Sequence, residues 1–279
     1  MTKAAAVLIL LALAPAVGAS QTTTRQYRSR AGVSYYSQAD TGGLIARAES
    51  ALAADPRNPQ KFIDLGVAES GVRHYREAVQ TFTRGLAIAP DNALLYRWRG
   101  HRYLTLRDFD NALRDLAMGN ARDSTIYGIW YHLGVTHFVR GEFEGAATCF
   151  ARARTMAPDD NEYTGANDWL WMSLMRAGKP DEARARLAEM RPAPNITSAA
   201  AYRQRIRLYR GEIGPEEVVT PADTAGIALA TLSFGVGNWY MTRGDQKNAR
   251  RWFERAVSAA DGWPAFGFIA AEQELRRMH

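Results

Sequence analysis

Residues 130–158 read WYHLGVTHFVRGEFEGAATCFARARTMAP, and the same order of small, large and turn residues occurs twice more upstream. The step between copies is 34 residues in several independent columns. Within residues 59–160 the columns are Gly66, Gly100 and Gly134, then Ala78, Ala112 and Ala146, then Phe82, Leu116 and Phe150. A fixed period of this size predicts a stack of like supersecondary units in place of one globular core.

Each copy predicts two helices joined by a turn. An apolar stretch of about 14 residues comes first, and a second, amphipathic stretch ends at a proline such as Pro90 or Pro158. A glycine inside a helix costs roughly 1 kcal/mol relative to alanine. We therefore expect another helix to approach closely at Gly66, Gly100 and Gly134. Stacked units then complete a core that one helix pair cannot bury alone.

These residues resemble the tetratricopeptide repeat, whose signature reads W-x2-L-G-x2-Y, then A-x3-F, then P. The third unit follows it with Trp130, Leu133, Gly134, Ala146, Phe150 and Pro158. His137 stands where tyrosine is usual in that unit, and Glu69 stands there in the first. The resemblance implies an all-α solenoid, a right-handed superhelix of antiparallel helix pairs with about five to six units and a C-terminal capping helix.

The resemblance places one solenoid domain over residues 41–279. Its parts are a half unit at 43–58, units at 59–92, 93–126, 127–160 and 164–190, a diverged pair at 198–220, a unit at 228–262 and a capping helix at 264–277. Ala183 lies 37 residues after Ala146, so about three residues are inserted near 161–164. The charged side chains of the last helix suit a solvent-facing cap; they are Glu272, Glu274, Arg276 and Arg277.

The first 19 residues have the layout of a secretory signal peptide. Lys3 precedes an apolar run from Ala4 to Val17, and small residues end at Ala19, after which we expect cleavage. The run is shorter than the roughly 20 apolar residues of a spanning helix, although an uncleaved anchor is the alternative. Cys149 is the single cysteine, so no intramolecular disulfide forms. These features favour the periplasm of a bacterium, or secretion from it.

Residues 20–40 are rich in Gln, Thr, Ser, Arg and Tyr, with no acid before Asp40. This composition predicts a disordered basic and polar linker. The alternative is an arm that docks into the repeat groove through Tyr27, Tyr35 or Tyr36.

The net charge bounds the class of partner. The formal charge of +6 becomes +5 once Lys3 is removed with the signal peptide, and this balance mildly favours acidic partners such as anionic peptides, envelope polymers or lipid head groups. No nucleic-acid-binding motif occurs, so we do not expect a nucleic-acid partner. We also expect no stable membrane insertion after cleavage, and the sequence sets no oligomeric state.

Motifs for chemistry are absent from the sequence. It contains no G-x-S-x-G, no phosphate-binding P-loop, no H-E-x-x-H and no cysteine pair. His132 and His137 lie five apart, a spacing that does not readily place both on one metal. We therefore predict no catalytic residue, no metal site and no cofactor, and we expect Cys149 to be a small buried hydrophobe.

A groove is the expected binding site. Arg97 and His101 lie four apart and share a helix face, and the resemblance places them on the concave surface. Tyr131, Asp168 and Asn238 fall at comparable places in other units, which would give a mixed polar and aromatic partner-binding surface. The alternative for Arg97 and His101 is a solvated helix face.

One charged residue stands at a packing position. Arg99 occupies the place of a signature leucine in the second unit, so it needs a partner. We expect an internal ion pair with Glu69, one unit earlier.

Two functional classes follow from these features. The first is a non-catalytic scaffold that holds a peptide or partner protein in the concave groove. The alternative is an enzyme or small-ligand binder with a polar pocket around Arg97, His101, His132 and Asp168, to which Asn238 also contributes. A third reading is a subunit of an envelope complex that binds through the convex face or the N-terminal arm. A scaffold predicts an open trough with dispersed polar residues, whereas an enzyme predicts a closed pocket where these side chains converge with perturbed pKa values. Blocks within residues 91–277 are also similar to exported bacterial tetratricopeptide repeat proteins, a similarity that implies no reaction.

Overall fold

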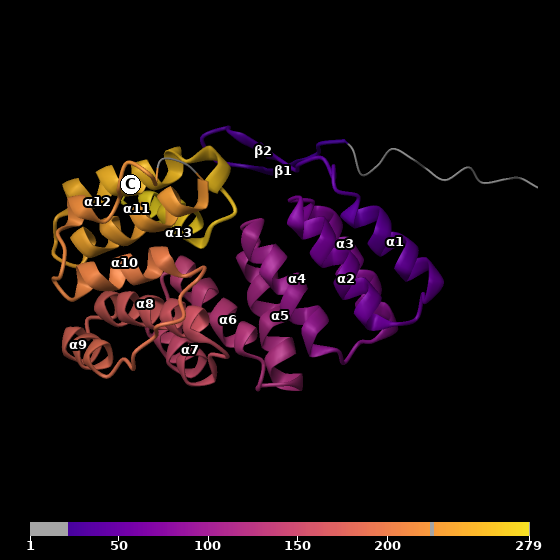
Figure 1. The fold of residues 1–279 in the computed structure, drawn as a ribbon, viewed down its shortest axis with the longest axis horizontal. Helices are drawn as coiled ribbons and strands as arrows, with labels where there is room; N and C mark the ends of the chain where they lie inside the picture. The colour runs from indigo at the N-terminus through magenta and orange to yellow at the C-terminus, as the bar shows by residue number, and fades with distance from the viewer. Residues whose placement is uncertain (1–21, 224–225, 279) are drawn as a thin grey trace, which may run out of the picture.

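A computed structural model describes residues 22–223 and 226–278, so the signal peptide predicted at residues 1–19 lies outside the described residues. Within these ranges the chain is all-α, apart from one hairpin, and its thirteen α-helices pack as antiparallel pairs (Figure 1). The first helices are α1 (Leu44–Ala54), α2 (Pro59–Gly71), α3 (Tyr75–Ile88), α4 (Ala93–Thr105), α5 (Phe109–Arg122), α6 (Tyr127–Arg140) and α7 (Phe143–Met156). The others are α8 (Asp160–Arg176), α9 (Pro180–Ala188), α10 (Ala200–Tyr209), α11 (Gly226–Met241), α12 (Gln246–Ser258) and α13 (Phe266–Arg277). The predicted helical solenoid is confirmed.

The repeated glycines have the packing reason that the sequence predicts. A Cβ atom added to Gly134 would lie 2.8 Å from the ring of Phe150, and one added to Gly237 would lie 2.6 Å from Phe253. The large residue of the second helix therefore fills the space above the glycine of the first helix in its own unit. This pairing brings the two helices of a unit close together, which fixes how each unit presents its outer faces.

Short polar side chains start several helices. Asn92 accepts a hydrogen bond from the amide of Leu95 at the start of α4, and Asp108 accepts one from Asn111 at the start of α5. Asp159 does the same for α8. These side chains satisfy amides that have no partner within the helix, a contribution of about 1 kcal/mol each.

The three-residue insertion lengthens a helix. α8 has 17 residues, whereas α6 and α7 have 14 each. Residues 161–164 lie in the first turn of α8, so the extra residues extend the helix and leave the next pair, α8 and α9, intact.

The diverged pair at 198–220 forms only half of a unit. Its first helix is α10, but its second is a single 3-10 turn, η2 (Pro215–Glu217). Gly211 has a positive φ of 72° and ends α10, and Pro215 follows four residues later. These breakers leave too few residues for a second α-helix before α11 begins.

Residues 25–36 form a hairpin, so the prediction of a disordered linker is wrong here. Strand β1 (Arg25–Arg28) pairs antiparallel with β2 (Ser34–Tyr36). The buried amide side chain of Gln26 bonds to the Glu77 carboxylate and to the Arg76 amide on α3. Tyr27 and Tyr35 stack on Trp263 with ring centroids 6.3 and 5.5 Å away. The aromatic residues dock the arm as the alternative expected, but against the C-terminal part of the chain, while Tyr36 is exposed.

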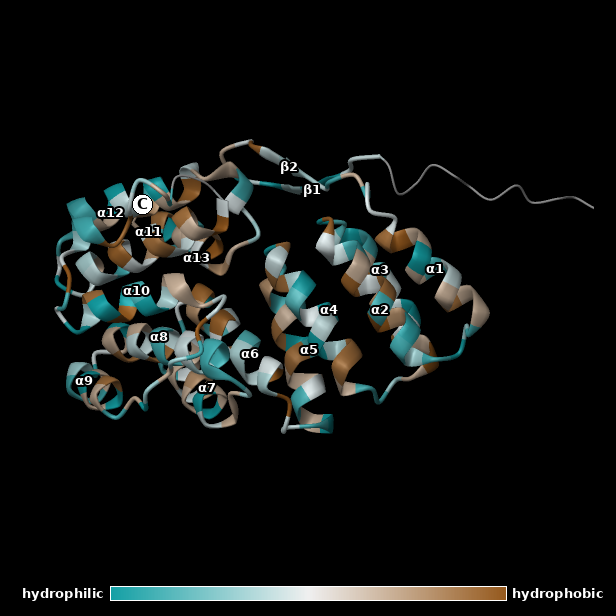
Figure 2. Ribbon diagram, in the orientation of Figure 1, coloured by the Kyte–Doolittle hydropathy of each residue, from teal (hydrophilic) through white to brown (hydrophobic). Residues whose placement is uncertain are grey.

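The C-terminal helix is buried, so the prediction of a solvent-facing cap is wrong for its acidic residues. α13 packs against α6, α11 and α12; it runs beside α11, whose residues from Leu229 to Asn238 are all buried and which Figure 2 shows as largely hydrophobic. Glu274 is buried and pairs with Arg176 of α8 at 2.8 Å. Glu272 pairs with Arg107 at 2.7 Å. The hairpin and α13 thus join the two ends of the superhelix (Figure 1).

The predicted ion pair between Arg99 and Glu69 is also wrong. Arg99 forms a bidentate ion pair with Asp115 of α5, with N–O distances of 2.6 and 2.9 Å. Glu69 instead accepts a hydrogen bond from Thr81 at 3.0 Å. At both positions the side chain interacts with the second helix of its own unit.

Candidate functional site

The start of α13 covers the faces of α4 and α6 that carry His101 and His132. The ring of Phe266 lies 5.4 Å from the ring of His101 on α4 and 5.6 Å from that of His132 on α6, centroid to centroid. The two imidazoles stack at 4.0 Å. We call Arg97, His101, Arg102, His132 and Phe266 the inner cluster. It forms because the chain curls far enough for α13 to reach α6.

Arg97 packs flat within this cluster. Its guanidinium carbon lies 3.8 Å from the ring centre of Trp98. The backbone leaves room for it at Gly128, where an added Cβ would meet the guanidinium at 2.6 Å. Burial, together with the charge of Arg102, lowers the pKa of Arg97 to about 10. Arg97 therefore remains a cation at neutral pH in a desolvated place.

Both histidines of the inner cluster are neutral near pH 7. Burial lowers the pKa of His101 and His132 well below the ordinary value, and the charges of Arg97 and Arg102 lower both further. The Nδ1 of His132 contacts the carbonyl oxygen of Gly128, and because a carbonyl only accepts, Nδ1 carries the proton.

Asp168 lies in a separate, sealed site. Its carboxylate is 2.8 Å from Nη2 of Arg205 on α10, and both side chains are fully buried. Burial raises the pKa of Asp168 to about 7, against the opposing effect of Arg205. Arg205 also donates to the hydroxyl of Tyr209 at 3.2 Å and to the carbonyl of Thr231 at 3.3 Å. This pair joins α8, α10 and α11 and has no surface on which a partner could bind.

Asn238 lies in the core at another position. Its side-chain oxygen accepts a hydrogen bond from Arg176 at 3.2 Å, beside the ion pair of Arg176 with Glu274. Asn238 is fully buried. Of the five groove residues predicted from the sequence, the structure places Arg97 and His101 together with Tyr131 nearby, while Asp168 and Asn238 bind core arginines.

Tyr131 leads from the inner cluster toward an open groove. Its ring lies 5.8 Å from that of His132 and 6.2 Å from that of Phe266. Its hydroxyl donates to the hydroxyl of Tyr202 on α10 at 3.3 Å. Tyr202 in turn lines the groove described next, so one predicted residue contacts its wall.

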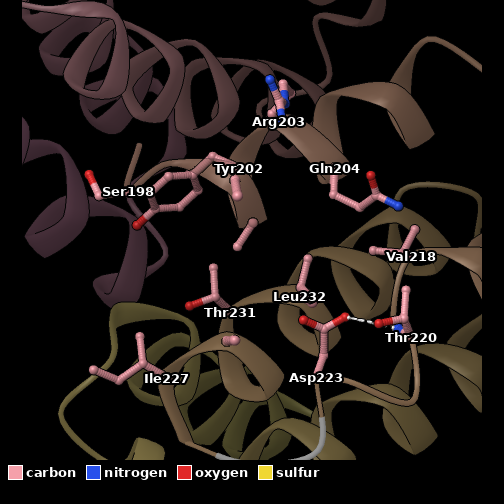
Figure 3. A pocket seen from close by; sticks show the side chains of 13 residues that line it. Ser198, Tyr202, Arg203, Gln204, Val218, Thr220, Asp223, Ile227, Thr231 and Leu232 are labelled. Carbon is pink, nitrogen blue, oxygen red and sulfur yellow. Dashed lines mark hydrogen bonds between the residues drawn. The ribbon is translucent and has the colours of Figure 1, made fainter. Parts of the chain in front are cut away.

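The α10–α11 groove is a hollow of about 650 Å³ between α10, the segment 218–223 and the start of α11. Figure 3 shows Tyr202 on one side facing Ile227 and Thr231 on the other, with Val218 and Leu232 on the apolar wall. Gln204 also lines the groove. Ile227 is 57% exposed, the largest exposed fraction among the large hydrophobic residues described. Sequence reasoning missed this groove because its walls come from the half unit that lacks the signature.

The charges at the rim of the groove are few. The carboxylate of Asp223 accepts two hydrogen bonds from Thr220, at 2.7 Å from the hydroxyl and 3.0 Å from the amide (Figure 3). Arg203 is exposed at the edge and adds positive charge. The lining has no histidine or cysteine. Tyr202, whose pKa is raised by burial, lines the groove, whereas Arg97, His101 and Asp168 do not.

Three further observations concern metal binding, membrane spans and the single cysteine. The residues that the structure describes contain no group of three or more His, Cys, Asp or Glu side chains arranged to hold a metal ion. No helix within residues 22–223 and 226–278 is both long and apolar enough to cross a bilayer. Cys149 is buried, and burial raises the pKa of its thiol to about 11.

Comparison with known families identifies the repeat. A family model described as tetratricopeptide repeat matches residues 99–161. This match shows similarity to the tetratricopeptide repeat over residues 99–161. This region covers the second and third units, where the signature columns and the glycine packing are clearest. The chain is also similar to a heat-shock protein cognate co-chaperone, sgt12 of Aspergillus fumigatus, with 24% identity over 161 residues. The match covers 56% of this chain and 46% of the co-chaperone, so the chain spans about half the length of this relative.

Two solved structures have a similar fold over most of the chain. YrrB, described as having an unusual peptide-binding site, is 16% identical, with a TM-score of 0.49 over 77% of this chain and 93% of YrrB. PilW, a type IV pilus biogenesis factor, is 20% identical, with a TM-score of 0.47 over 76% of this chain and 83% of PilW.

Proposed function

We propose that this chain is a non-catalytic scaffold in the bacterial periplasm or outside the cell, and that it holds an extended segment of a partner protein in the α10–α11 groove. Tetratricopeptide repeats are protein–protein interaction scaffolds and are generally non-catalytic. The finer statement, that the groove is the binding site, rests on the shape and chemistry of the groove itself.

The observation that carries the proposal is the exposed apolar side chain at an open hollow. Ile227 projects at the rim while Val218 and Leu232 form an apolar wall, and Tyr202 faces them. An exposed apolar side chain beside a hollow offers area that a partner can bury favourably. An aromatic ring next to such a residue is a common anchor in interfaces.

Dispersed polar groups complete this surface. The amide of Gln204 can both donate to and accept from a peptide backbone, and it lies on the wall of the groove. Arg203 at the edge favours a neutral or acidic segment, while the Asp223 carboxylate is engaged by Thr220. The partner segment that fits is therefore extended, apolar at one or two side chains, and without a strong positive charge.

An active site would need a different arrangement. Catalytic groups must reach a substrate, and their pKa shifts serve chemistry only where a substrate can bind. In this chain Asp168 is sealed between helices, and His101 is stacked against His132 and Phe266. Asp168 and His101 therefore make packing and ion-pair contacts within the chain, which favours the scaffold over the enzyme.

Export is part of the proposal and rests on the sequence of residues 1–19. The mature chain would begin at Ser20, close to the first described residues of the hairpin arm. N-terminal sequencing of the protein from the cell envelope or medium tests this point. A start at Ser20 supports export with cleavage, and an intact Met1 in the cytoplasm contradicts it.

Peptide selection tests the groove directly. Random 12-residue peptides are selected by phage display on residues 20–279, and the affinity of selected peptides is measured by fluorescence anisotropy. Ile227→Glu should weaken binding about 10-fold or more, since it removes an apolar contact and adds an unpaired charge. The matched control is Ile88→Glu at the end of α3, where the side chain is 47% exposed and far from the groove residues in sequence. Equal affinities for both variants would reject the groove.

A further inference from the structure

The inner cluster contains two cations without an ion-pair partner in the part of the chain that the structure describes, Arg102, which is buried, and Arg97, which is partly buried. Arg102 is only 6% exposed, and its guanidinium carbon lies 4.9 Å from the ring centre of Tyr75. Arg97 lies on Trp98. Among the described residues neither arginine forms an ion pair with a carboxylate, although the charge of Glu162 acts on Arg97. By contrast, the buried Arg205 forms an ion pair with Asp168.

Three nitrogen atoms of the inner cluster are buried without a hydrogen-bond partner among the described residues. They are Nη1 of Arg97, Nδ1 of His101 and Nε of Arg102. A buried donor without an acceptor costs about 1–3 kcal/mol, and more when the group is charged. The two arginine nitrogens are donors, and Nδ1 of the neutral His101 is one in the tautomer that carries the ring proton there. All three atoms belong to side chains of α4, which indicates that an acceptor belongs beside this helix.

Both arginines keep their charge in this place. Burial lowers the pKa of Arg102 to about 10, as it does for Arg97, so each is protonated at neutral pH. The two charges lie close enough to act on each other and on His101. Two positive charges in a desolvated region repel one another, and an anion of charge −2 would offset both.

The start of α13 adds to the positive potential. α13 has 12 residues and begins at Phe266, whose ring contacts both histidines. Its N-cap residue is Ala265, which has no polar side chain to satisfy the first amides. The N-terminus of a helix attracts anions through these amides and the helix dipole. The inner cluster thus combines a helix N-terminus with buried, unpartnered side-chain nitrogens.

We propose that the inner cluster binds a small divalent oxyanion of the phosphate or sulfate class, which accepts hydrogen bonds from Arg97, His101 and Arg102. A tetrahedral oxyanion presents acceptor oxygens in several directions, whereas a carboxylate presents two in one plane. Three donors on separate side chains fit the first better. The anion would lie where α4, α6 and α13 meet, so it would fasten the C-terminal helix to the second and third units. This site is distinct from the α10–α11 groove and does not depend on the proposed scaffold function.

The test compares melting temperatures with and without the anion. Residues 20–279 are melted in buffers of equal ionic strength that contain sodium chloride, acetate, sulfate or inorganic phosphate, each at about 10 mM. Phosphate or sulfate should raise the Tm of the wild type by roughly 5 °C, because a ligand that binds only the folded state stabilises it. Titration calorimetry with phosphate should give one site per chain.

Variants separate a binding role from a structural one. Arg102→Met and Arg97→Met keep the length of the side chain and remove its charge, so both should lose the phosphate-dependent shift. In chloride alone, Arg102→Met should melt at or above the wild-type temperature, since it removes an unpaired buried charge. Arg114→Met, at an exposed position of α5, is the control and should keep the full shift.

Several results would overturn the proposal. A wild-type Tm unaffected by phosphate and sulfate would do so, as would Arg102→Met melting lower by the same amount in every buffer, which would make Arg102 purely structural. An equal shift with acetate would reject the divalent class. Glycerol 3-phosphate distinguishes the source of the anion: tighter binding than inorganic phosphate indicates a head group of a larger ligand, and weaker binding indicates the free ion.

Discussion

The imidazole rings of His101 and His132 stack with their centroids 4.0 Å apart, and the ring of Phe266 contacts both. The two residues come from α4 and α6, so their contact joins neighbouring units at the concave face. Both are neutral because burial and the nearby arginines lower their pKa values. Protonation of either ring would place a charge in this contact and destabilise the folded chain.

We expect the stability of the chain to fall in mild acid through these histidines. In the unfolded chain a histidine protonates near pH 6.5, whereas in the folded chain His101 and His132 stay neutral. Below about pH 6.5 the unfolded state binds more protons, so the free energy of unfolding falls by at most about 1.4 kcal/mol per pH unit for each histidine. Above that pH this contribution does not change.

Two acids act in the opposite direction, so the histidine effect is measured as a difference. Burial raises the pKa of Glu69 and of Asp168 to about 7, and these groups stabilise the folded state as the pH falls. Urea unfolding of wild type and His101→Phe is therefore compared from pH 8 to 5. The wild type should lose stability relative to the variant only below about pH 6.5. Parallel curves over the whole range would contradict the assignment.

The buried pair of Asp168 and Arg205 should tolerate joint replacement better than single replacement. Arg205→Met leaves the Asp168 carboxyl buried without its cation, so we expect the free energy of unfolding to fall by about 3 kcal/mol. Adding Asp168→Leu removes the unpaired carboxyl and should restore most of this loss. Chemical denaturation of the two variants measures both effects. Additive losses would show that the pair is not a coupled unit.

The glycine of each first helix should resist substitution. Gly134→Ala places a Cβ atom 2.8 Å from the Phe150 ring, and the overpacking should cost about 1–3 kcal/mol. Gly71→Ala in α2 is the control, because no atom lies within 4 Å of the added Cβ; it should change stability little or add up to about 1 kcal/mol. Thermal unfolding compares them, and equal effects would exclude a packing role for Gly134.

Arg107 should hold the hairpin arm and the C-terminal region together. It donates to Glu272 at 2.8 Å and to the carbonyl of Trp263 at 2.9 Å, and it lies 4.3 Å from the ring centre of Tyr27. Arg107→Met should lower stability by about 2–3 kcal/mol and speed hydrogen exchange in residues 25–36.

The control for this prediction is Arg73→Met. Arg73 has the same unusual backbone conformation, with a φ of 63° against 65° for Arg107, so backbone effects are matched. Its side chain makes one exposed bond of 3.1 Å, to the carbonyl of Asp261. If both variants accelerate hydrogen exchange equally in the hairpin, Arg107 has no special role in holding the hairpin to the C-terminal region.

The periodic part of the fold could be predicted from the sequence because its contacts are local. Gly134 and Phe150 lie 16 residues apart and repeat with the period, so their columns reveal both helices and their packing. The contacts of the C-terminal helix and the hairpin arm with distant helices could not be predicted in this way. The contact between Arg107 and Glu272 spans 165 residues and has no counterpart in other units. The capping helix consequently looked solvent-facing in sequence, although Glu274 is buried.

The candidate site was predicted only in part for the same reason. Arg97 and His101 share a helix face as expected, but Phe266 covers that face through the long-range fold. Asp168 fell at a groove position of the repeat, yet the half unit that follows supplies Arg205 and buries it. The repeat pattern does not indicate that Ile227 is exposed or that only a 3-10 turn follows α10.

Site-specific photocrosslinking tests the central claim most directly. A benzophenone amino acid replaces Gln204 in the α10–α11 groove or Met118 on α5, which is 39% exposed and serves as the control position. The cells are irradiated and the crosslinked peptides are identified by mass spectrometry. The scaffold account predicts one recurrent partner segment, extended and apolar, joined at position 204 and not at 118. Crosslinks at 118 alone, or the same proteins at both positions, would contradict it.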